Sequence, residues 1–480
     1  MSPVSASSPS RHRRPFVALA TVVLAGLIPV VTSTADPAGA AGTYPLYSSR
    51  PLAGTVGTPR ELTRDPDHPH RQLCYTSPCT EKTSNYAEEV RSLAVTGNRL
   101  FLGGFFSALV DASHNRISPA TPFMAEVDAT TGRLSADQTF IRNARPDGTV
   151  EAMLVSPDGK RLYVGGRFSN IGGGAAKRIA ALNLQTGKLD PTFRPPVPSE
   201  DVLALALSGG RLFIGGEFLK VGSKAFAGVA ALNAADGSLV PGWDAPTNYG
   251  GSAVAQSATY TESTQGVVRD IAVIGGGRTL MVGGTFMHLG HTRTEDPKGD
   301  RYSGLIAINT SDGHMSSWKP LNNRPVYRMA ASPDGSKVYS VEGGSGGWIG
   351  AFRPGTVPPV WIGRVDGDVL AVAATDKRVY VGGHFDAEEP NPDAECLKHI
   401  PTNCIKTGTH HRHLVAFDMS GKADPKWTAQ ADTAEGPTTL LAGPKALYVG
   451  GNFTNILEKS KLDGGKGIPH PGFALFPPGG

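Results

Sequence analysis

Charged side chains recur just ahead of apolar runs that have the length of β-strands. They are Glu89, Glu200, Asp201, Arg269, Arg324, Asp368 and Glu435. If each run is the innermost strand of a sheet, these groups ring the mouth of a central channel. Carboxylates that converge on one opening could hold a hard cation such as Ca²⁺ through oxygen ligands, or attract a basic ligand. Solvated turn residues are the alternative interpretation, and no cofactor other than Ca²⁺ is expected.

Catalysis by paired acids is the second chemistry that these residues permit. Glycoside cleavage depends on the three-dimensional separation of two carboxyl groups, which a sequence does not give. The chain has no His-Glu-x-x-His motif and no phosphate-binding Gly-Lys-Ser/Thr motif. The segment Gly343–Gly347 contains Gly-x-Ser-x-Gly without the strand-turn-helix context of a nucleophile elbow. Three tyrosines in long polar segments, Tyr249, Tyr260 and Tyr302, are suited to stacking on sugar rings.

The four cysteines form two local pairs along the chain, Cys74 with Cys79 and Cys396 with Cys404. Their spacings differ from the Cys-x-x-Cys steps of zinc sites. In an exported chain, two local disulfides are the simplest prediction, although three connectivities are open. The second pair lies in a segment with several histidines, so a zinc site is the alternative to a disulfide-closed loop that carries surface histidines. These histidines are His399, His410, His411 and His413.

Residues 1–40 have the pattern of a secretory signal peptide. A basic start at 11–14 precedes an apolar run from Val17 to Val31 and the small residues 38–40. The run is shorter than the ~20 residues that span a bilayer, which disfavours a membrane anchor. The paired arginines also resemble a twin-arginine export signal, with His12 where that signal has Ser or Thr. We expect residues 1–40 to be removed and the rest to be secreted without membrane insertion.

Charge and composition narrow the class of protein. The chain carries a formal charge of +4, and removal of residues 1–40, with three arginines and one aspartate, leaves +2. A nearly neutral chain disfavours nucleic-acid binding, which needs clustered Lys and Arg. The 60 glycines and 38 prolines, with 39% hydrophobic residues, are typical of many short strands and turns. We expect a monomer.

One phrase recurs along the chain, an apolar run with a central glycine pair and a following aromatic residue. Its copies are RLFLGGFF at 99–106, RLYVGGRF at 161–168, RLFIGGEF at 211–218, TLMVGGTF at 279–286, RVYVGGHF at 378–385 and ALYVGGNF at 446–453. A degraded seventh copy, SVEGGSGGW, lies at 340–348. Each glycine weakens a strand by about 0.5–1 kcal/mol relative to alanine. We therefore expect the glycines to let neighbouring sheets approach closely.

Each unit of the repeat is predicted to form four strands joined by tight turns. An aromatic residue recurs in the expected fourth strand, at Phe140, Phe193, Trp243, Trp318, Trp361 and Trp427. Seven such units predict an all-β chain, a seven-bladed β-propeller of four-stranded antiparallel blades. The last unit lacks a fourth strand. We expect residues 41–89 to supply it as an N-terminal closing strand, with Tyr44 or Tyr47 in the aromatic place, followed by the Cys74–Cys79 loop, and residues 90–480 to form the propeller.

The phrase LYVGGxF, followed by AALN and TGxLDPxF, resembles the delta-60 repeat of secreted bacterial β-propellers. The resemblance covers residues 90–475, and its general layout is similar to that of kelch repeats. It implies a propeller fold, and it implies no shared activity and no catalytic residues.

Long polar segments join second to third strands, or one unit to the next, and all of them are expected on one face. They span 107–122, 247–266, 287–303, 386–413 and 454–471. Loops on a rigid scaffold are where binding residues concentrate, although loops also shield strand ends. We expect a secreted, non-catalytic binding protein whose loop face recognises a polysaccharide or a protein. The alternatives are an extracytoplasmic carbohydrate-active hydrolase or lyase that uses acids at the channel mouth, and a structural cell-surface protein.

Overall fold

The structure is a computed structural model. It describes residues 44–58, 62–63, 86–113, 115–117, 122–226, 228–245, 267–285, 304–318, 320, 324–343, 346–386, 388–389, 411–432, 436–457 and 467–479. These residues are nearly all in strands and turns, with one short helix, α1 (Thr139–Ala144). Among them, no helix has the length and apolar character needed to cross a membrane.

The main sheets share one plan, in which three consecutive long strands pair antiparallel. The first strands are β3 (Glu89–Thr96), β8 (Thr149–Val155), β13 (Val202–Ser208), β18 (Val267–Ile274), β21 (Val326–Ala331), β25 (Asp368–Ala374) and β30 (Gly436–Ala442). The middle strands are β4 (Arg99–Phe105), β9 (Arg161–Arg167), β14 (Arg211–Gly216), β19 (Thr279–Thr285), β22 (Val338–Glu342), β26 (Arg378–His384) and β31 (Leu447–Asn452). The third strands are β7 (Met124–Asp128), β12 (Ile179–Asn183), β17 (Val229–Asn233), β20 (Leu305–Asn309), β23 (Gly347–Phe352), β28 (Leu414–Asp418) and β34 (Phe473–Phe476).

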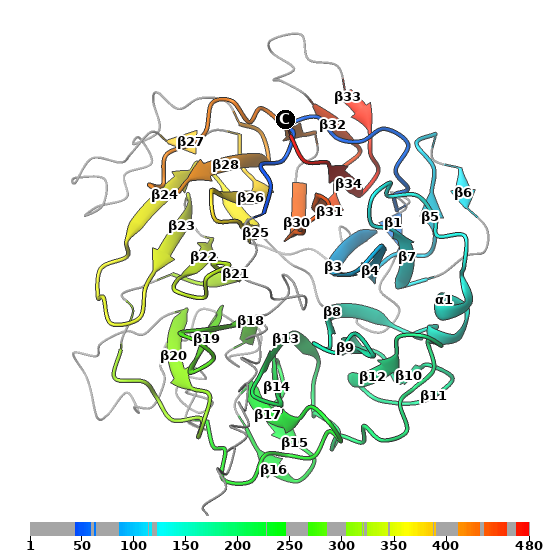
Figure 1. The fold of residues 1–480 in the computed structure, drawn as a ribbon, viewed down its shortest axis with the longest axis vertical. Coiled ribbons are helices and arrows are strands. Elements are labelled where there is room, and N and C mark those ends of the chain that lie inside the picture. The colour runs from blue at the N-terminus through cyan, green and yellow to red at the C-terminus, as the bar shows by residue number, and fades with distance from the viewer. Residues whose placement is uncertain are drawn as a thin grey trace, which may run out of the picture.

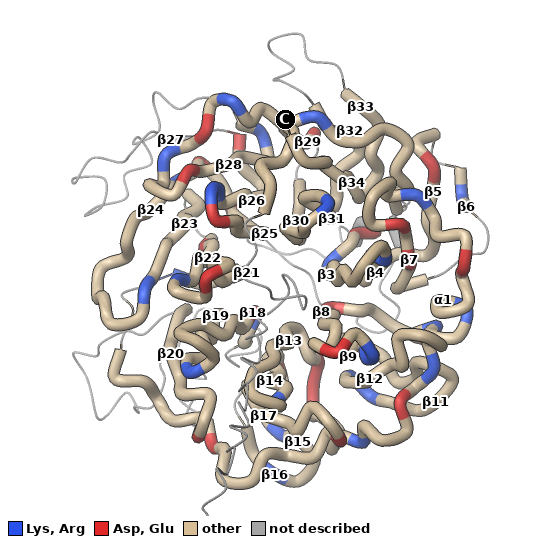
Figure 2. The backbone as a smooth tube through the Cα atoms, in the orientation of Figure 1, with Lys and Arg blue, Asp and Glu red and all other residues tan. Residues whose placement is uncertain are grey.

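These sheets lie side by side around a common centre, in a propeller-like arrangement (Figure 1). Each first strand contacts the first strand of the next sheet, from β3 through β8, β13, β18, β21 and β25 to β30, and β30 in turn contacts β3. The apolar core lies between neighbouring sheets, because the buried clusters combine residues of adjacent units. Acidic and basic residues are interspersed around the tube (Figure 2).

The fourth strands differ from the prediction, since most main sheets have three strands. Within the described ranges, the sheet that begins with β21 alone continues, with β24 (Trp361–Val365) and β27 (Glu388–Glu389). In other units the expected fourth strand is reduced to a single bridge, such as Leu182 with Leu189. Phe140 lies in α1, where the Asp137 carboxylate accepts a hydrogen bond from the Thr139 amide at 2.8 Å.

The recurring aromatic residues nevertheless occupy equivalent places. All six are buried, and most pack on an aromatic residue of the middle strand in their own unit. Ring centroids are 4.9 Å apart for Phe140 and Phe101, and 5.5 Å apart for Phe193 and Tyr163. The recurring aromatic residue in the sequence therefore predicted a buried packing position correctly, even in units where no fourth strand forms.

Short strands form small separate sheets in the segments that precede or connect the main strands. They form β1 (Leu62–Thr63) with β2 (Tyr86–Ala87), β5 (Leu109–Val110) with β6 (Arg116–Ile117), β10 (Asn170–Ile171) with β11 (Gly174–Ala175), β15 (Lys220–Val221) with β16 (Lys224–Ala225), and β29 (Gln430–Ala431) with β32 (Asn455–Leu457) and β33 (Gly467–Pro469).

The N-terminal segment 44–58 lies against the end of the chain. The Ser48 amide donates a hydrogen bond to the Pro477 carbonyl at 2.8 Å, and the Gly479 amide donates to the Leu46 carbonyl at 2.7 Å. Tyr47 is 2% exposed, and its hydroxyl donates to the Gly443 carbonyl at 2.7 Å. These contacts place the segment beside β34, the third strand of the last main sheet.

The first glycine of each pair faces the first strand of the next sheet. A Cβ added at Gly165 would lie 2.8 Å from Val202 Cγ1, and one at Gly450 would lie 2.7 Å from Val90 Cγ1. The same close approach recurs at Gly103, Gly215, Gly283 and Gly382. The missing side chains let adjacent sheets pack together, as expected from the sequence.

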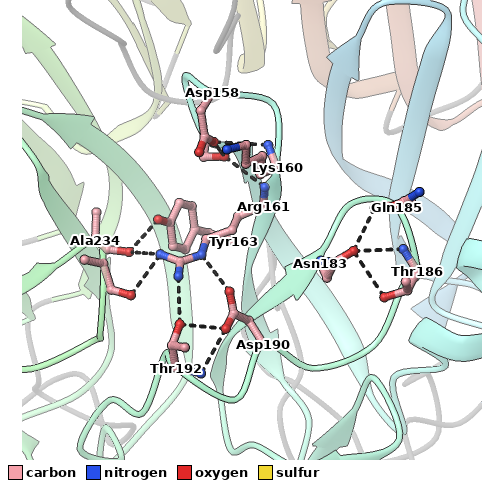
Figure 3. Close-up of polar contacts among 12 residues, drawn as sticks. Asp158, Lys160, Arg161, Tyr163, Asn183, Gln185, Thr186, Asp190, Thr192 and Ala234 are labelled. Atoms are coloured by element: carbon pink, nitrogen blue, oxygen red, sulfur yellow. Dashed lines mark hydrogen bonds and ion pairs between the residues drawn. The ribbon is translucent and has the colours of Figure 1, made fainter.

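The leading arginine and the aromatic residue of the phrase also join neighbouring sheets (Figure 3). Arg161 donates from Nε to Asp190 at 2.7 Å, within its own unit, and from Nη1 to the Ala234 carbonyl of the next unit at 2.9 Å. The Tyr163 hydroxyl donates to the same carbonyl at 2.6 Å. Hydrogen bonds from Thr192 and Arg161 lower the pKa of Asp190 in spite of the opposing effect of its burial. This arginine is therefore a structural link between sheets.

Candidate functional site

Antiparallel pairing brings the start of the first strand, the end of the middle strand and the start of the third strand to one edge of each main sheet. Glu89 at the start of β3 pairs with Phe105 at the end of β4, and Gly103 pairs with Met124 at the start of β7. We call this edge, where first strands begin, middle strands end and third strands begin, the loop edge. The residues that flank the long polar segments 287–303 and 386–413 lie at this edge.

Acidic residues just before the first strands fasten the loop that follows the middle strand. Asp147 accepts hydrogen bonds from the amides of Ser169 and Asn170 at 2.8 and 2.9 Å. Asp432 accepts the equivalent bonds from Thr454 and Asn455 at 2.9 and 2.8 Å. These hydrogen bonds lower the pKa of Asp147 against the opposing effect of burial. Such carboxylates shape the loop edge.

Glu200 and Asp201 lie together at the start of β13. Asp201 is 3% exposed and accepts from Arg167 Nε at 2.7 Å, while its second oxygen lies 3.6 Å from Arg178 Nε. Glu200 is paired with Arg178 at 3.4 Å. Both predicted acids are therefore engaged by arginines of the preceding sheet.

Glu89 belongs to a second ion-pair network, which reaches the centre of the molecule. Arg91 Nε lies 2.5 Å from Glu89, and Arg91 Nη1 lies 2.7 Å from Glu151 of the neighbouring sheet. Burial opposes the charge of Arg91, but the two carboxylates outweigh it and raise its pKa above the ordinary value. Arg91 and Glu151 line a small central hollow.

The opposite wall of this hollow holds Asp270 and Arg328. Asp270 is 1% exposed and accepts hydrogen bonds from the amides of Ile271 at 2.8 Å and Met329 at 2.7 Å. Burial raises the pKa of Asp270 to about 6, although Arg328 acts in the other direction. Residues of all the first strands line the hollow, so the centre is filled by paired charges and apolar side chains.

Arg269 and Asp368 lie on either side of Tyr327. The Arg269 guanidinium carbon is 5.3 Å from the centroid of the Tyr327 ring. Burial raises the pKa of Tyr327, and the negative charge of Asp368 adds to this effect. The three residues come from the neighbouring strands β18, β21 and β25, so the structure brings Arg269 and Asp368 to one part of the loop edge.

Arg324 lies in a third cluster, in the degraded fifth unit. Its guanidinium carbon is 4.5 Å from the Trp348 ring, and its Nη1 donates to the Gly346 carbonyl at 2.9 Å. Arg364 lies over the same ring at 5.4 Å. Burial lowers the pKa of Arg324, the negative charge of Glu342 opposes this, and Arg364 adds to it.

Several predicted residues lie outside the described ranges. They are residues 1–40, Glu435, Tyr249, Tyr260, Tyr302, Cys74, Cys79, Cys396 and Cys404. Two histidines of the alternative zinc segment are described, and both are buried rather than on the surface: His411 is 4% exposed and His413 is 1% exposed. Within the described part of the chain, no three His, Cys, Asp or Glu side chains are grouped to hold a metal ion.

The sequence reasoning missed the charges inside the strands. Arg91, Glu151, Asp270 and Arg328 lie two or three residues after the starts of their strands. Each first strand has a register irregularity at this point, as between Val90 and Ser92. The sequence signal that could have revealed these central charges was a charged residue within an otherwise apolar strand. Partly exposed aromatic side chains at the loop edge were missed too; they are Phe105, Phe123, Tyr327 and Trp348.

Comparison with known proteins agrees with this architecture. A family model described as "Domain of unknown function (DUF5122) beta-propeller" matches residues 156–193. No curated protein matches the chain. Among solved structures, the chain is similar to the "Crystal structure of WD40 beta propeller domain of Doa1", with 10% identity, 81% of this chain and 93% of that chain covered, and a TM-score of 0.45. Residues 156–193 run from the turn after β8 to Phe193. The matched unit and the arrangement of the sheets support a β-propeller fold.

Proposed function

We propose that this chain is a secreted, non-catalytic binding protein that recognises an extracellular polysaccharide at the loop edge. In this proposal the main sheets are the blades of a closed seven-bladed propeller of the delta-60 type. The N-terminal segment 44–58 supplies the outer strand of the last blade, and residues 1–40 direct export. The hydrogen bonds between Ser48 and Pro477 and between Gly479 and Leu46 support the role of the N-terminal segment.

One observation carries the binding proposal, namely the partly exposed aromatic rings at the loop edge. Phe105 and Phe123 lie together there, with centroids 6.3 Å apart, and Tyr327 and Trp348 lie at the starts of β21 and β23. Aromatic faces combine a large apolar area with little conformational entropy, which suits the faces of sugar rings. Rings held on strand ends are also positioned by a rigid scaffold.

The acids at the same edge favour binding over hydrolysis. Asp201 is held by Arg167 at 2.7 Å, Glu89 is held by Arg91, and Asp147 accepts backbone amides. A general acid must be able to bring its proton to the leaving group, whereas these three carboxylates accept hydrogen bonds from partners within the protein. Asp201, Glu89 and Asp147 are therefore poorly placed to donate a proton to a leaving group.

The test combines a glycan array with an assay for product release from cell-wall polysaccharides, using the protein without residues 1–40. We expect binding without turnover. Turnover that is abolished by Glu200→Gln or Asp368→Asn would establish the hydrolase or lyase alternative instead. Binding to proteins alone, or no binding at all, would also contradict the proposal.

A matched pair of variants connects binding to the aromatic rings. Phe123 has φ 64° and Arg178 has φ 69° at the same place in the next unit, so Phe123→Gly and Arg178→Gly make the same backbone change. Both relieve a left-handed backbone conformation that glycine prefers. Arg178→Gly also removes the ion pairs to Glu200 and Asp201, but only Phe123→Gly removes a ring, so Phe123→Gly should weaken glycan binding more. Equal glycan binding by the two variants would show that the Phe123 ring does not contribute to binding.

A further inference from the structure

The fifth unit carries a carboxylate where other units carry a glycine. Strand register pairs Val326 with Glu342 and Arg328 with Val341, just as it pairs Val150 with Gly166 and Ala152 with Gly165 in the second unit. The counterparts of the glycine pair are thus Val341 and Glu342, and not the glycines that begin at Gly343. A carboxyl side chain therefore occupies a position at which the other units have no side chain.

Glu342 is part of a buried polar cluster. It is 3% exposed, and it accepts a hydrogen bond from the Ser340 hydroxyl at 3.0 Å. Burial raises the pKa of Glu342 to about 8, although Ser340 and Arg324 act in the other direction. At neutral pH the carboxyl group is therefore largely protonated.

Two arginines of this cluster contact one indole ring. The guanidinium carbons of Arg324 and Arg364 lie 4.5 and 5.4 Å from the centroid of Trp348. Arg364 is 2% exposed, whereas Arg324 and Trp348 are partly exposed at the loop edge. The contact between Arg324 Nη1 and the Gly346 carbonyl at 2.9 Å holds the first guanidinium beside the start of β23.

The indole nitrogen of Trp348 has no hydrogen-bond acceptor among the described residues, and its surface is buried. A buried indole N–H almost always has a partner, because an unpaired donor costs about 1–3 kcal/mol. Two other tryptophans show the usual arrangement: the Nε1 of Trp318 donates to the Thr356 carbonyl at 2.6 Å, and that of Trp243 donates to the Thr310 carbonyl at 3.2 Å. The Trp348 donor is thus placed for an acceptor from outside the described chain.

We propose that Arg324 and Trp348, with the buried Arg364 against the same indole ring, bind a carboxylate group of an acidic polysaccharide. Guanidinium groups match the planar geometry of a carboxylate and bind it more strongly than neutral donors do. The indole N–H supplies a further donor at the same place. This inference rests on the proposed function, since it names the class of polysaccharide that the loop edge recognises.

The test follows the indole N–H signal of Trp348 by NMR. The chain has five tryptophans, so a ¹⁵N-indole spectrum is simple, and Trp348→Phe assigns the relevant signal by its loss. Titration with oligogalacturonate should shift this signal, and titration with neutral galactan oligosaccharides should not. A shift with inorganic phosphate but not with oligogalacturonate would overturn the assignment to a carboxylated sugar, as would no shift with either.

Four variants test the donors by oligogalacturonate affinity. Trp348→Phe keeps an aromatic ring but removes the N–H, and Arg324→Gln removes one charge; each should weaken binding by about tenfold or more, the range for hydrogen bonds to charged groups. The controls are Trp318→Phe, whose donor is satisfied within the protein, and the exposed Arg353→Gln of the same sheet. Equal losses in the controls would refute the site. Binding of neutral glycans, with no binding of oligogalacturonate and no Trp348 shift, would refute this inference and leave the proposed function intact.

Discussion

Gly103 shows how a single missing side chain positions two sheets. A Cβ at this position would lie 2.6 Å from Val150 Cγ1 and 3.0 Å from Met153 Cε, both on the first strand of the next sheet. Real Cβ atoms do not approach other atoms this closely, so Gly103→Ala must displace the neighbouring strand. The glycine pair was recognised in the sequence because it recurs, and its packing role followed from the cost of glycine in a strand.

Gly103→Ala should lower the free energy of unfolding by about 1–3 kcal/mol, the usual cost of overpacking a core. Urea denaturation measures the change. The compensating substitution Val150→Ala in the same protein should recover part of the loss, because it removes the atoms that clash. Gly174→Ala is the control, since Gly174, like Gly103, does not have a positive φ, and an added Cβ would meet only the end of the Leu189 side chain, at 3.1 Å. An equal loss of unfolding free energy in Gly103→Ala and in the control variant would show that the effect comes from the replacement of glycine itself and not from the clash with the next sheet.

His413 makes stability depend on pH. Burial lowers its pKa to about 4, although the Gly383 carbonyl, 2.9 Å from Nδ1, acts in the other direction. An unfolded histidine titrates near 6.5, so between these values the unfolded chain binds more protons and stability rises with pH. The contribution is fully present above about 6.5 and is lost as pH falls to about 4.

The variant His413→Asn should flatten this dependence. Asn tolerates the positive φ of 63° at this position better than most residues do. Urea denaturation at a series of pH values should give a smaller decrease for the variant across the interval from about 6.5 to 4. A slope remains, because burial also lowers the pKa of His470 to about 4. An unchanged slope in the variant would show that His413 is not the titrating group.

At the scale of elements, the first three strands of each unit were predictable and the fourth was not. Alternating apolar residues and tight turns specify a strand that pairs along its length. The fourth segments pair through single bridges, such as Leu232 with Leu239, and are held by buried rings such as Trp243. In the fifth unit the sequence prediction was wrong, because the glycines that begin at Gly343 look like the glycine pair. The strand register instead places Val341 and Glu342 at the positions of the pair.

The N-terminal segment should behave as an integral part of the last sheet. Tyr47→Phe removes the bond from its hydroxyl to Gly443, and Tyr448→Phe removes the equivalent bond of 2.8 Å to the Ala129 carbonyl. Each buried carbonyl loses its donor, so each variant should lose about 1–2 kcal/mol of stability. Thermal unfolding compares the two. A loss in Tyr448→Phe without one in Tyr47→Phe would show that the segment is only loosely attached.

At the scale of the whole molecule, every main sheet depends on its neighbours. Gly450 of the last sheet faces Val90 of the first, and the buried clusters combine residues of adjacent sheets. The number of repeats in the sequence predicted this arrangement. The central ion pairs were not predictable, because Arg91 and Glu151 are brought together only by the angle between two sheets that lie 60 residues apart.

Deletion of residues 43–60 should destabilise the fold sharply. The last sheet would lose the hydrogen bonds of Ser48 and Leu52 to Pro477 and Leu475, and the buried ring of Tyr47. Circular dichroism with thermal denaturation should show a lower and broader transition than in the full chain without residues 1–40. A cooperative transition at an unchanged temperature would contradict a closing role for the segment.

The seam between the two ends of the chain has a consequence for connectivity. The Gly479 amide lies 2.7 Å from the Leu46 carbonyl, so a short peptide linker could join these ends without moving either. New termini could then be opened at an exposed turn such as the one around Gly159, since surface turns tolerate such rearrangement. A circularly permuted chain of this kind would still form the same contacts. The order of the sheets along the chain is then not what determines the fold; the contacts between neighbouring sheets determine it.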